Sequence, residues 1–245
     1  MLTGKALLES LVDNLNELGM PNMAATLDDV YHKPGFLEMD RLTLIAELIG
    51  AEYREKVSKR VNNRLKYAKL VGSPAEIDKC VNTVHREYLP SGLPSVLSSM
   101  DFISKGFNVC ILGASDSGKT YLAKAIGIKA CENFRVGYFH CAEILEQYTS
   151  LKRADFSKYE KKLKGLMKLD LIILDDFLLH TLSEESEIKL LFSILEERMQ
   201  KQKSTIICSQ RNPESWTAMI MNDEISANAI AKRVTKHYTV MIKTK

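Results

Sequence analysis

Eight residues from Gly113 to Thr120 have the types and the spacing of a phosphate-binding loop. Their sequence fits the pattern G-x-x-x-x-G-K-[ST], and small residues allow successive backbone N–H groups to converge on an anion. A helix beginning at Lys119 adds its positive end. In this pattern Lys119 reaches the β- and γ-phosphates, and the Thr120 hydroxyl holds Mg²⁺. We therefore expect a bound nucleoside triphosphate. The residues expected to contact it are Gly113, Ala114, Ser115, Asp116, Ser117, Gly118, Lys119, Thr120 and Tyr121.

Two adjacent carboxylates follow a second apolar segment. Residues 171–174 are predicted to form a buried strand, and Asp175 and Asp176 stand at its carboxyl end. Downstream of a phosphate-binding loop, this is the position of a Walker B acid. We expect Asp175 to bind Mg²⁺ through water, and Asp176 to orient and deprotonate the attacking water. The alternative is a pair of acids in an ordinary turn after a strand.

Two further polar side chains are candidates for the same site. Gln210 follows a predicted strand, so its amide is a candidate sensor of the γ-phosphate or the attacking water; a simple loop is nearly as consistent with the residue type. Arg233 lies on a predicted helix with Ile230 and Val234 on its buried side, which predicts that Arg233 points outward. In oligomeric P-loop ATPases, such an arginine can reach a neighbouring subunit's γ-phosphate.

The elements that must position these residues alternate from about residue 95 onward. Strands are predicted at residues 108–112, 135–140, 171–174, 204–209 and 238–242. Helices are predicted at residues 119–130, 143–150, 156–167 and 184–200. Long crossovers between successive strands require a parallel sheet flanked by helices, with the nucleotide at the carboxyl ends of the strands. Residues 95–245 are therefore predicted to be an α/β domain with a five-stranded parallel sheet.

The first part of the chain has a different pattern. Leucines recur at helical spacing up to Gly19, and Pro21 suits the first turn of a second helix. A long helix is predicted over residues 40–70, and its apolar positions are expected to form a buried stripe. These positions are Leu44, Ile45, Leu48, Ile49, Tyr53, Val57, Val61, Leu65 and Ala68. We therefore predict a small all-helical domain over residues 1–72 and a connector over residues 73–94.

The end of this long helix is strongly basic. Residues 54–69 carry seven cations against Glu55 alone, which is seven minus one, or +6 in 16 residues. A row of cations on one helix suits the phosphate backbone of DNA, and a solvated helix face is the alternative. The candidate DNA-binding residues are Arg54, Lys56, Lys59, Arg60, Arg64, Lys66 and Lys69. A second basic segment between predicted strands adds Lys158, Lys161 and Lys162.

Composition narrows the class of protein. The chain has 245 residues, 45% of them hydrophobic, and a net charge of +3, so its total charge does not by itself indicate a nucleic-acid partner. Its five cysteines are not paired as C-x-x-C, which predicts reduced, buried thiols rather than zinc ligands. No secretory signal pattern and no apolar run of membrane length are present. We expect a cytoplasmic protein without a membrane partner.

In this order the motifs resemble those of the AAA+ ATPases, and among these the insertion-sequence transposition helper ATPases of the IstB type, relatives of the DnaC helicase loaders. The matching segments are residues 113–123, 174–176, 204–210 and 229–234. The front of the chain is similar too, through "LNELGMPNMAATLDDV" and "AEYREKVSKRVNNRLKYAKL". The resemblance thus covers nearly the whole chain.

The resemblance implies a function. Family members bind ATP and Mg²⁺, assemble side by side on double-stranded target DNA, deform it and deliver it to a partner transposase, and hydrolysis resets the assembly. It implies a homo-oligomer and a slow ATPase stimulated by DNA or a partner, with Asp176, Lys119, Arg233 and Gln210 as catalytic residues. Asp176 stands where many relatives have glutamate, and Gln210 where many have asparagine. The chain ends at Lys245, so we expect no helical lid with a second sensor arginine.

Three other functions fit parts of the sequence. A DnaC-like replicative helicase loader would have the same core, and its front domain would bind protein. A small-molecule or nucleotide kinase would need an arginine-rich lid, which the sequence does not show. A nucleotide-gated binding module would bind ATP and hardly hydrolyse it, and ATPase measurements with and without duplex DNA separate it from the helper.

Overall fold

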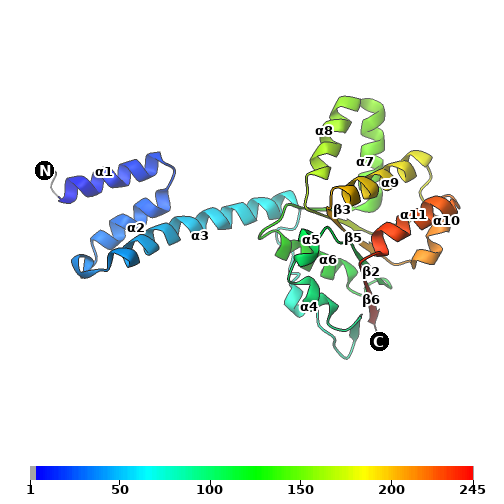
Figure 1. Ribbon diagram of the computed structural model, residues 1–245, viewed down its shortest axis with the longest axis horizontal. Coiled ribbons are helices and arrows are strands. Elements are labelled where there is room, and N and C mark those ends of the chain that lie inside the picture. Colours follow the sequence, from blue (N-terminus) through cyan, green and yellow to red (C-terminus); the bar gives the residue numbers. More distant parts are fainter. Residues whose placement is uncertain (1–3, 245) are drawn as a thin grey trace. The chain divides into compact units, whose positions relative to one another are not determined.

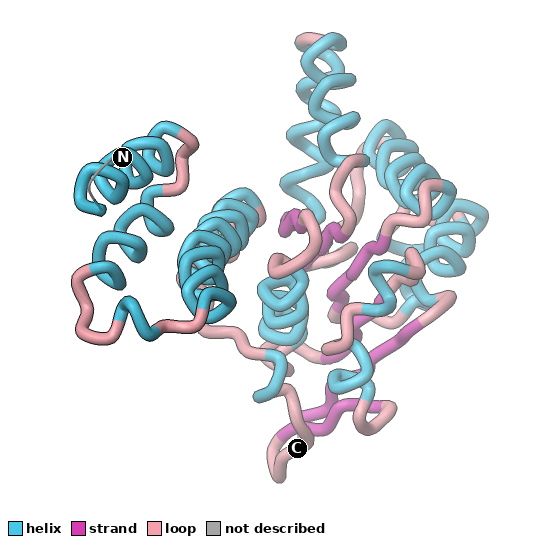
Figure 2. The backbone as a smooth tube through the Cα atoms, turned by 60° about the vertical axis from the view of Figure 1, so that its left-hand side comes forward, coloured by secondary structure: helices cyan, strands magenta, loops and turns pink. Residues whose placement is uncertain are grey.

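The computed structural model describes residues 4–244, which divide into two compact units. One unit extends to Asn63 and the other begins at Arg64, so the division falls within the long helix α3 (Arg41–Tyr67). Figure 2 shows the first unit as helices and loops, whereas every strand lies in the second unit.

The first unit is built from a helical hairpin and most of α3. Helix α1 (Gly4–Glu17) packs against α2 (Pro21–Tyr31), and the short 3₁₀ helix η1 (Phe36–Glu38) follows. The Glu52 carboxylate on α3 accepts hydrogen bonds from the backbone N–H groups of Asn22 (3.0 Å) and Met23 (3.2 Å). These are among the N–H groups that a helix leaves unpaired in its first turn, so Glu52 acts as a cap for α2.

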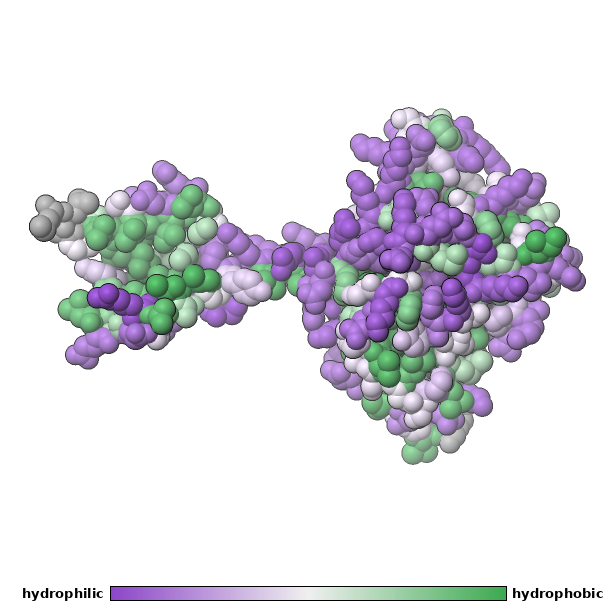
Figure 3. All heavy atoms as spheres, in the orientation of Figure 1, coloured by the Kyte–Doolittle hydropathy of each residue, from purple (hydrophilic) through white to green (hydrophobic). Residues whose placement is uncertain are grey.

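The prediction of a continuous buried stripe along α3 is wrong for the first half of the helix. Leu48 is buried, but Ile45, Ile49 and Tyr53 are 50%, 54% and 65% exposed. A unit this small has too little interior to cover every apolar position of its helices. Figure 3 shows the resulting hydrophobic side chains gathered on the surface of this unit.

The second unit contains one six-stranded sheet. Its strand order is β1-β6-β2-β5-β4-β3, and every adjacent pair is parallel except β1 and β6. The strands are β1 (Arg86–Leu89), β2 (Val109–Gly113), β3 (Val136–His140), β4 (Leu171–Asp175), β5 (Ser204–Ser209) and β6 (Tyr238–Thr244). The five predicted strands are all present. The prediction of a sheet of only five strands is wrong, because β1 lies within the segment expected to be a connector.

Helices cover both faces of this sheet (Figure 1). Ile111 and Ile173 face the cluster that contains Leu122 and Ile126 of α6, whereas Leu112 faces the cluster of α7, α9 and α11. The longer helices are α6 (Lys119–Ala130), α7 (Cys141–Ala154), α8 (Phe156–Met167), α9 (Glu185–Gln200) and α11 (Glu224–Thr235). The shorter ones are η2 (Ile77–Lys79), α4 (Leu93–Leu97), α5 (Asp101–Ser104), η3 (Pro213–Ser215) and α10 (Trp216–Met219). The predicted α/β architecture is confirmed.

All five cysteines are buried and free, as predicted, and all lie in the second unit. Burial raises the pKa of Cys110 and of Cys141 to about 12. Since the thiolate is the reactive form, these thiols are chemically inert in the folded protein.

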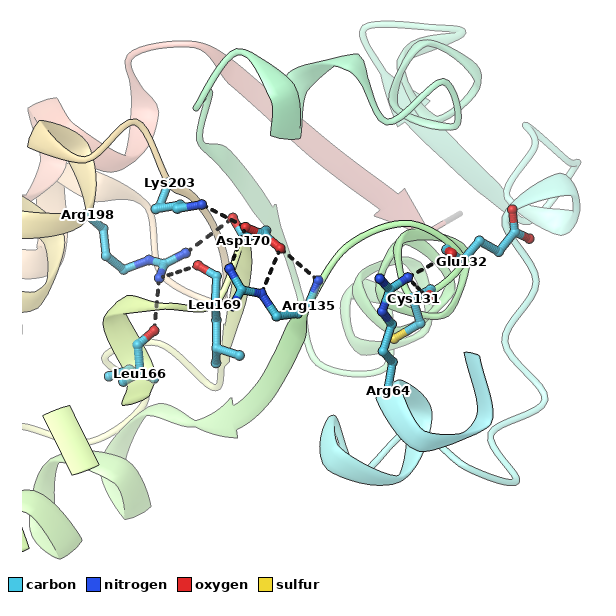
Figure 4. A network of polar contacts seen from close by, with 9 residues as sticks. All are labelled: Arg64, Cys131, Glu132, Arg135, Leu166, Leu169, Asp170, Arg198 and Lys203. Carbon is cyan, nitrogen blue, oxygen red and sulfur yellow. Dashed lines mark hydrogen bonds and ion pairs between the residues drawn. The ribbon is translucent and has the colours of Figure 1, made fainter. Parts of the chain in front are cut away.

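A buried arginine holds together the end of the sheet opposite the phosphate-binding loop. Arg198, near the end of α9, is 1% exposed, and burial lowers its pKa to about 9. Its guanidinium donates to the carbonyl oxygen of Leu169 at 3.1 Å (Figure 4). It donates to the carbonyl oxygen of Ser204 at 2.6 Å. It also donates to the Leu166 carbonyl and the Thr205 hydroxyl. One side chain thus ties the end of α8 to the starts of β4 and β5.

Asp170 stands beside this arginine and accepts from the Arg135 backbone N–H (2.9 Å) and the Lys203 ammonium (2.7 Å). Burial alone would raise the pKa of Asp170, but these donors lower it from 3.8 to about 2. A carboxyl group whose pKa is lower in the folded state stabilises the fold above its unfolded pKa, and this contribution is lost as the pH falls through the folded value.

We therefore expect Asp170→Asn to lower the free energy of unfolding at neutral pH by about 2 kcal/mol. The wild-type protein should lose this contribution between about pH 4 and pH 2, and the variant should not. Urea denaturation across this pH range measures both effects. An equal pH dependence in the two proteins would mean that Asp170 titrates normally.

Candidate nucleotide-binding site

The predicted phosphate-binding loop joins the carboxyl end of β2 to the first turn of α6, as the motif requires. Gly118 precedes the helix with φ 101°, a conformation that glycine adopts at little cost. At Gly113 an added Cβ would lie 2.6 Å from both the Ile242 carbonyl oxygen and the Ser117 hydroxyl oxygen. The loop is therefore wound so tightly that side chains are excluded at both glycines.

Lys119 is held across this loop. It is 6% exposed, and its ammonium donates to the Ala114 carbonyl at 2.6 Å. Burial lowers the pKa of Lys119, while the charges of Asp175 and Asp176 act in the opposite direction. Lys119 begins α6 directly after the loop, and the two acids stand at the end of β4 at the same edge of the sheet, where the phosphates of a triphosphate would need a positive charge.

Asp175, at the end of β4, is buried, 1% exposed, and accepts a hydrogen bond from the Tyr138 hydroxyl at 2.6 Å. It also accepts from the Asp176 backbone N–H at 3.0 Å. Burial and the neighbouring Asp175 raise the pKa of Tyr138, so the tyrosine remains a donor. The Asp175 carboxylate is therefore fixed in orientation before any ligand binds.

Asp176 is more exposed, and its carboxylate lies 3.1 Å from Nδ1 of His140. Tyr138 and His140 were not predicted as site residues. They lie two residues apart on β3, which places them on the same face of the strand, and β3 pairs in parallel with β4 so that His140 lies opposite Asp175. The signal was a Tyr-x-His pattern at the carboxyl end of a predicted strand.

Gln210 is exposed and follows β5, which lies between β2 and β4 in the sheet. The end of β5 is hydrogen-bonded to the residues that follow Asp175 and Asp176, since the Ser209 hydroxyl donates to the Phe177 carbonyl at 2.9 Å. Gln210 therefore stands at the same edge of the sheet as the phosphate-binding loop and the two acids.

The expectation that Arg233 points outward is wrong. Its side chain is 19% exposed and donates to Glu196 at 2.6 Å and to the Ala229 carbonyl at 2.7 Å. Its guanidinium also lies over the Phe192 ring, 4.4 Å from the ring centre. Glu196 and Phe192 are on α9, so these partners are not visible in the sequence of α11 alone.

The predicted DNA-binding cations of residues 54–69, on α3 and just after it, differ in the contacts they make. Arg64 donates to the carbonyl oxygens of Cys131 (3.2 Å) and Glu132 (2.8 Å), just after α6 (Figure 4). It therefore caps a helix end. Lys56 pairs with Glu52 (3.4 Å) and Lys59 with Glu55 (3.3 Å). The cations that are exposed and have no ion pair among the described residues are Arg54, Arg60, Lys66 and Lys69.

The second basic segment lies on α8. Lys158 pairs with Asp155 at 3.0 Å, Lys162 lies 5.2 Å from the centre of the Tyr148 ring, and Lys161 is exposed. These side chains remain at the surface, where they can exchange such contacts for a ligand.

The loop and its surroundings fit a nucleoside triphosphate with Mg²⁺. The first turn of α6 presents unpaired N–H groups beside Lys119. The Thr120 hydroxyl would supply an oxygen ligand, and Asp175 would hold the ion through water. Among residues 4–244, no group of three or more acidic, histidine or cysteine side chains is arranged to hold a metal.

Comparison with known proteins identifies the family to which this chain belongs. Residues 13–245 match the family described as IstB-like ATP binding protein. The chain belongs to this family. A Sinorhizobium fredii protein named as an insertion sequence ATP-binding protein is 30% identical to this chain over 223 residues, 91% of this chain and 89% of that protein. A Bacillus thuringiensis protein named as an ATP-binding protein of insertion sequence IS232 is 31% identical over 240 residues, 95% of this chain and 91% of that protein.

Solved structures place the IstB-like chain in the AAA+ fold. The DnaC helicase loader aligns with a TM-score of 0.52 and 23% identity, over 70% of this chain and 98% of that chain. DnaA from Aquifex aeolicus, bound to AMPPCP, aligns with a TM-score of 0.56 and 19% identity, over 71% of this chain and 51% of that chain. The expected ATP-binding AAA+ core, of the kind associated with insertion sequences, is confirmed. No helix among the described residues is long and apolar enough to cross a bilayer.

Proposed function

We propose that this protein is a slow ATPase, stimulated by DNA or by a partner, that assembles on double-stranded target DNA and delivers it to a transposase. Hydrolysis would then reset the assembly. The observation that carries the proposal is that Lys119, after β2, stands at the same carboxyl edge of the sheet as Asp175 and Asp176 at the end of β4, in a chain of the IstB-like family.

The chain's own residues divide the work of hydrolysis. The loop N–H groups and Lys119 hold the phosphates, and Thr120 and Asp175 would hold Mg²⁺, which neutralises phosphate charge when bound. The half-exposed Asp176 carboxylate orients a water and accepts its proton. His140, 3.1 Å from this carboxylate, positions it. Since aspartate is shorter than the glutamate of many relatives, the water must approach closer, which is consistent with slow turnover.

Oligomerisation is part of the proposal, and Arg233 is the candidate to reach a neighbouring subunit's γ-phosphate. To do so it must exchange its ion pair with Glu196 for that phosphate. Such an exchange would couple assembly to hydrolysis, because the arginine is unavailable while the pair persists.

DNA binding is assigned to the cations of α3. Arg54 and Arg60 are exposed, have no ion pair among the described residues, and lie six residues apart on one helix. Each phosphate contact releases counterions, so binding should weaken steeply with salt. We predict contacts to the phosphate backbone, which position a protein on DNA without reading its sequence.

We expect Arg54→Gln/Arg60→Gln to weaken binding to two unrelated duplexes equally and to reduce the log–log salt slope by about 2, one contact for each arginine. Fluorescence anisotropy over a salt series measures both quantities. The matched control is Lys33→Gln/Arg41→Gln, which removes the same charge from exposed positions in the same unit.

If both double variants lose the same DNA affinity, the effect depends on the total charge of the protein and not on Arg54 and Arg60 in particular. A loss on one duplex alone would indicate sequence readout. No loss on either would leave the helix as a solvated face or a protein-docking surface, and the helicase-loader alternative would then be favoured.

A further inference from the structure

Arg86, the first residue of β1, lies directly against the phosphate-binding loop. A Cβ added at Gly118 would lie 3.0 Å from the central carbon of the Arg86 guanidinium and 3.2 Å from its Nε and Nη1. The guanidinium therefore occupies the space left by the side chain that Gly118 lacks. Gly118 is the residue before Lys119, in the part of the loop whose N–H groups cradle phosphates.

The guanidinium is incompletely satisfied by the protein. Its Nε is buried and has no hydrogen-bond partner among the described residues. The arginines that form ion pairs in the described chain are Arg135, Arg153 and Arg233, and Arg86 is not one of them. A buried donor without a partner is costly, and the cost is larger for a charged group, so it calls for an explanation.

Tyr88 and Cys80 lie near Arg86 but supply no negative charge. Arg86 hydrogen-bonds to Tyr88 and its charge also acts on Cys80, while burial raises the pKa of both groups, so both remain neutral at physiological pH. Glu87 is the next residue of β1, and successive side chains of a strand point to opposite faces. No carboxylate of the described residues forms an ion pair with Arg86, Asp78 included, so the guanidinium is open to an anion from outside the protein.

We infer that Arg86 binds the phosphate chain of the nucleotide held by its own subunit. The positive end of α6 already attracts an anion to this place, and a guanidinium is suited to bind two phosphate oxygens at once. Lys119 and Arg86 would then flank the phosphates, one from the helix and one from β1. The inference rests on the nucleotide site of the proposed function and adds a binding residue from a strand outside the recognised motifs.

The position of Arg86 determines which step it affects. It lies at Gly118, in the part of the loop that cradles the α- and β-phosphates, rather than at the acids that face the attacking water. Its removal should therefore weaken ATP and ADP by the same factor. The KM for ATP should rise, and kcat at saturating ATP should stay the same, since binding is weakened equally before and during reaction.

The test is calorimetric titration of the full chain with Mg·ATP and Mg·ADP, together with steady-state kinetics. Arg86→Met should raise both Kd values about 10- to 100-fold, the usual loss for a charged hydrogen bond. Arg86→Lys should give an intermediate loss, because it keeps the charge without the planar fork. The control is Lys243→Met, which removes an exposed cation from the neighbouring strand β6 and should change neither Kd.

The possible outcomes separate this inference from the proposed function. If wild-type protein fails to bind Mg·ATP, or if Lys119→Ala binds it normally, the nucleotide site itself is wrong. If Lys119→Ala loses binding while Arg86→Met binds normally or more tightly, only the inference about Arg86 fails. If Arg86→Met does not fold, Arg86→Lys still tests the inference. Unchanged affinities of Arg86→Lys for Mg·ATP and Mg·ADP would mean that the Arg86 guanidinium does not contact the nucleotide.

Discussion

Asp176→Asn protein is expected to bind ATP with nearly wild-type affinity and to hydrolyse it at least about 100-fold more slowly. The change removes the proton acceptor and keeps the size of the side chain. Asp176 lies beyond the end of β4 and is more exposed than the buried Asp175, so its replacement should leave the phosphate-binding loop intact. Calorimetric titration with Mg·ATP and a phosphate-release assay measure the two effects.

Lys119→Ala is the matched contrast, because it should lose ATP binding by about 100-fold or more without unfolding the protein. Its ammonium donates to the Ala114 carbonyl across the loop, and Lys119 is not among the residues of the apolar core. If Asp176→Asn turns over ATP at nearly the wild-type rate, the water is activated elsewhere, with Gln210 as the next candidate. Turnover lost together with binding would mean that Asp176 is a ligand and not a base.

Arg198→Met is expected to lower the free energy of unfolding by about 3–5 kcal/mol, the largest loss of stability foreseen for this chain. The guanidinium donates to the carbonyls of Leu166, Leu169 and Ser204, and methionine would leave these buried acceptors without it. Urea denaturation followed by circular dichroism measures the change.

The control for Arg198 is Arg153→Met, which removes an exposed arginine paired with Glu184 and should cost less than about 1 kcal/mol. Arg198→Lys should fall between the two, because it keeps a charge and loses the fork. Equal effects of Arg198→Met and Arg153→Met would show that the buried network contributes little to stability.

The sequence predicted the nucleotide-binding half of the sheet well, because its signals are local. The phosphate-binding loop is defined by eight consecutive residues, and β2, β4 and β5 are short apolar runs with polar residues at their ends. Strand β1 has only four residues, and it is a strand only because β6 pairs with it from far along the chain. The position of Arg86 against the phosphate-binding loop depends on the pairing of β1 with β6. The sequence alone could not predict this position, because it does not show the pairing.

The residue types likewise gave the charges of the side chains, but they did not predict which groups those side chains contact. Arg64 and Arg233 were predicted to face DNA and a neighbouring subunit, yet one donates to carbonyls just after α6 and the other pairs with Glu196. The apolar stripe of α3 was predicted to be buried because its period is helical, but period alone does not tell how much protein is available to cover Ile49 or Tyr53. These outcomes depend on tertiary contacts between distant segments.

The burial of all five thiols in the second unit provides a built-in measure of how often that unit opens. A thiol reagent can modify Cys110 or Cys208 only after strands β2 and β5 become accessible, so the reaction rate follows local or global opening. A nucleotide that binds the folded form would slow this reaction in proportion to the stability it adds. Because the helical unit up to Asn63 contains no cysteine, the signal arises from the ATP-binding unit alone, and no labelled variant is required.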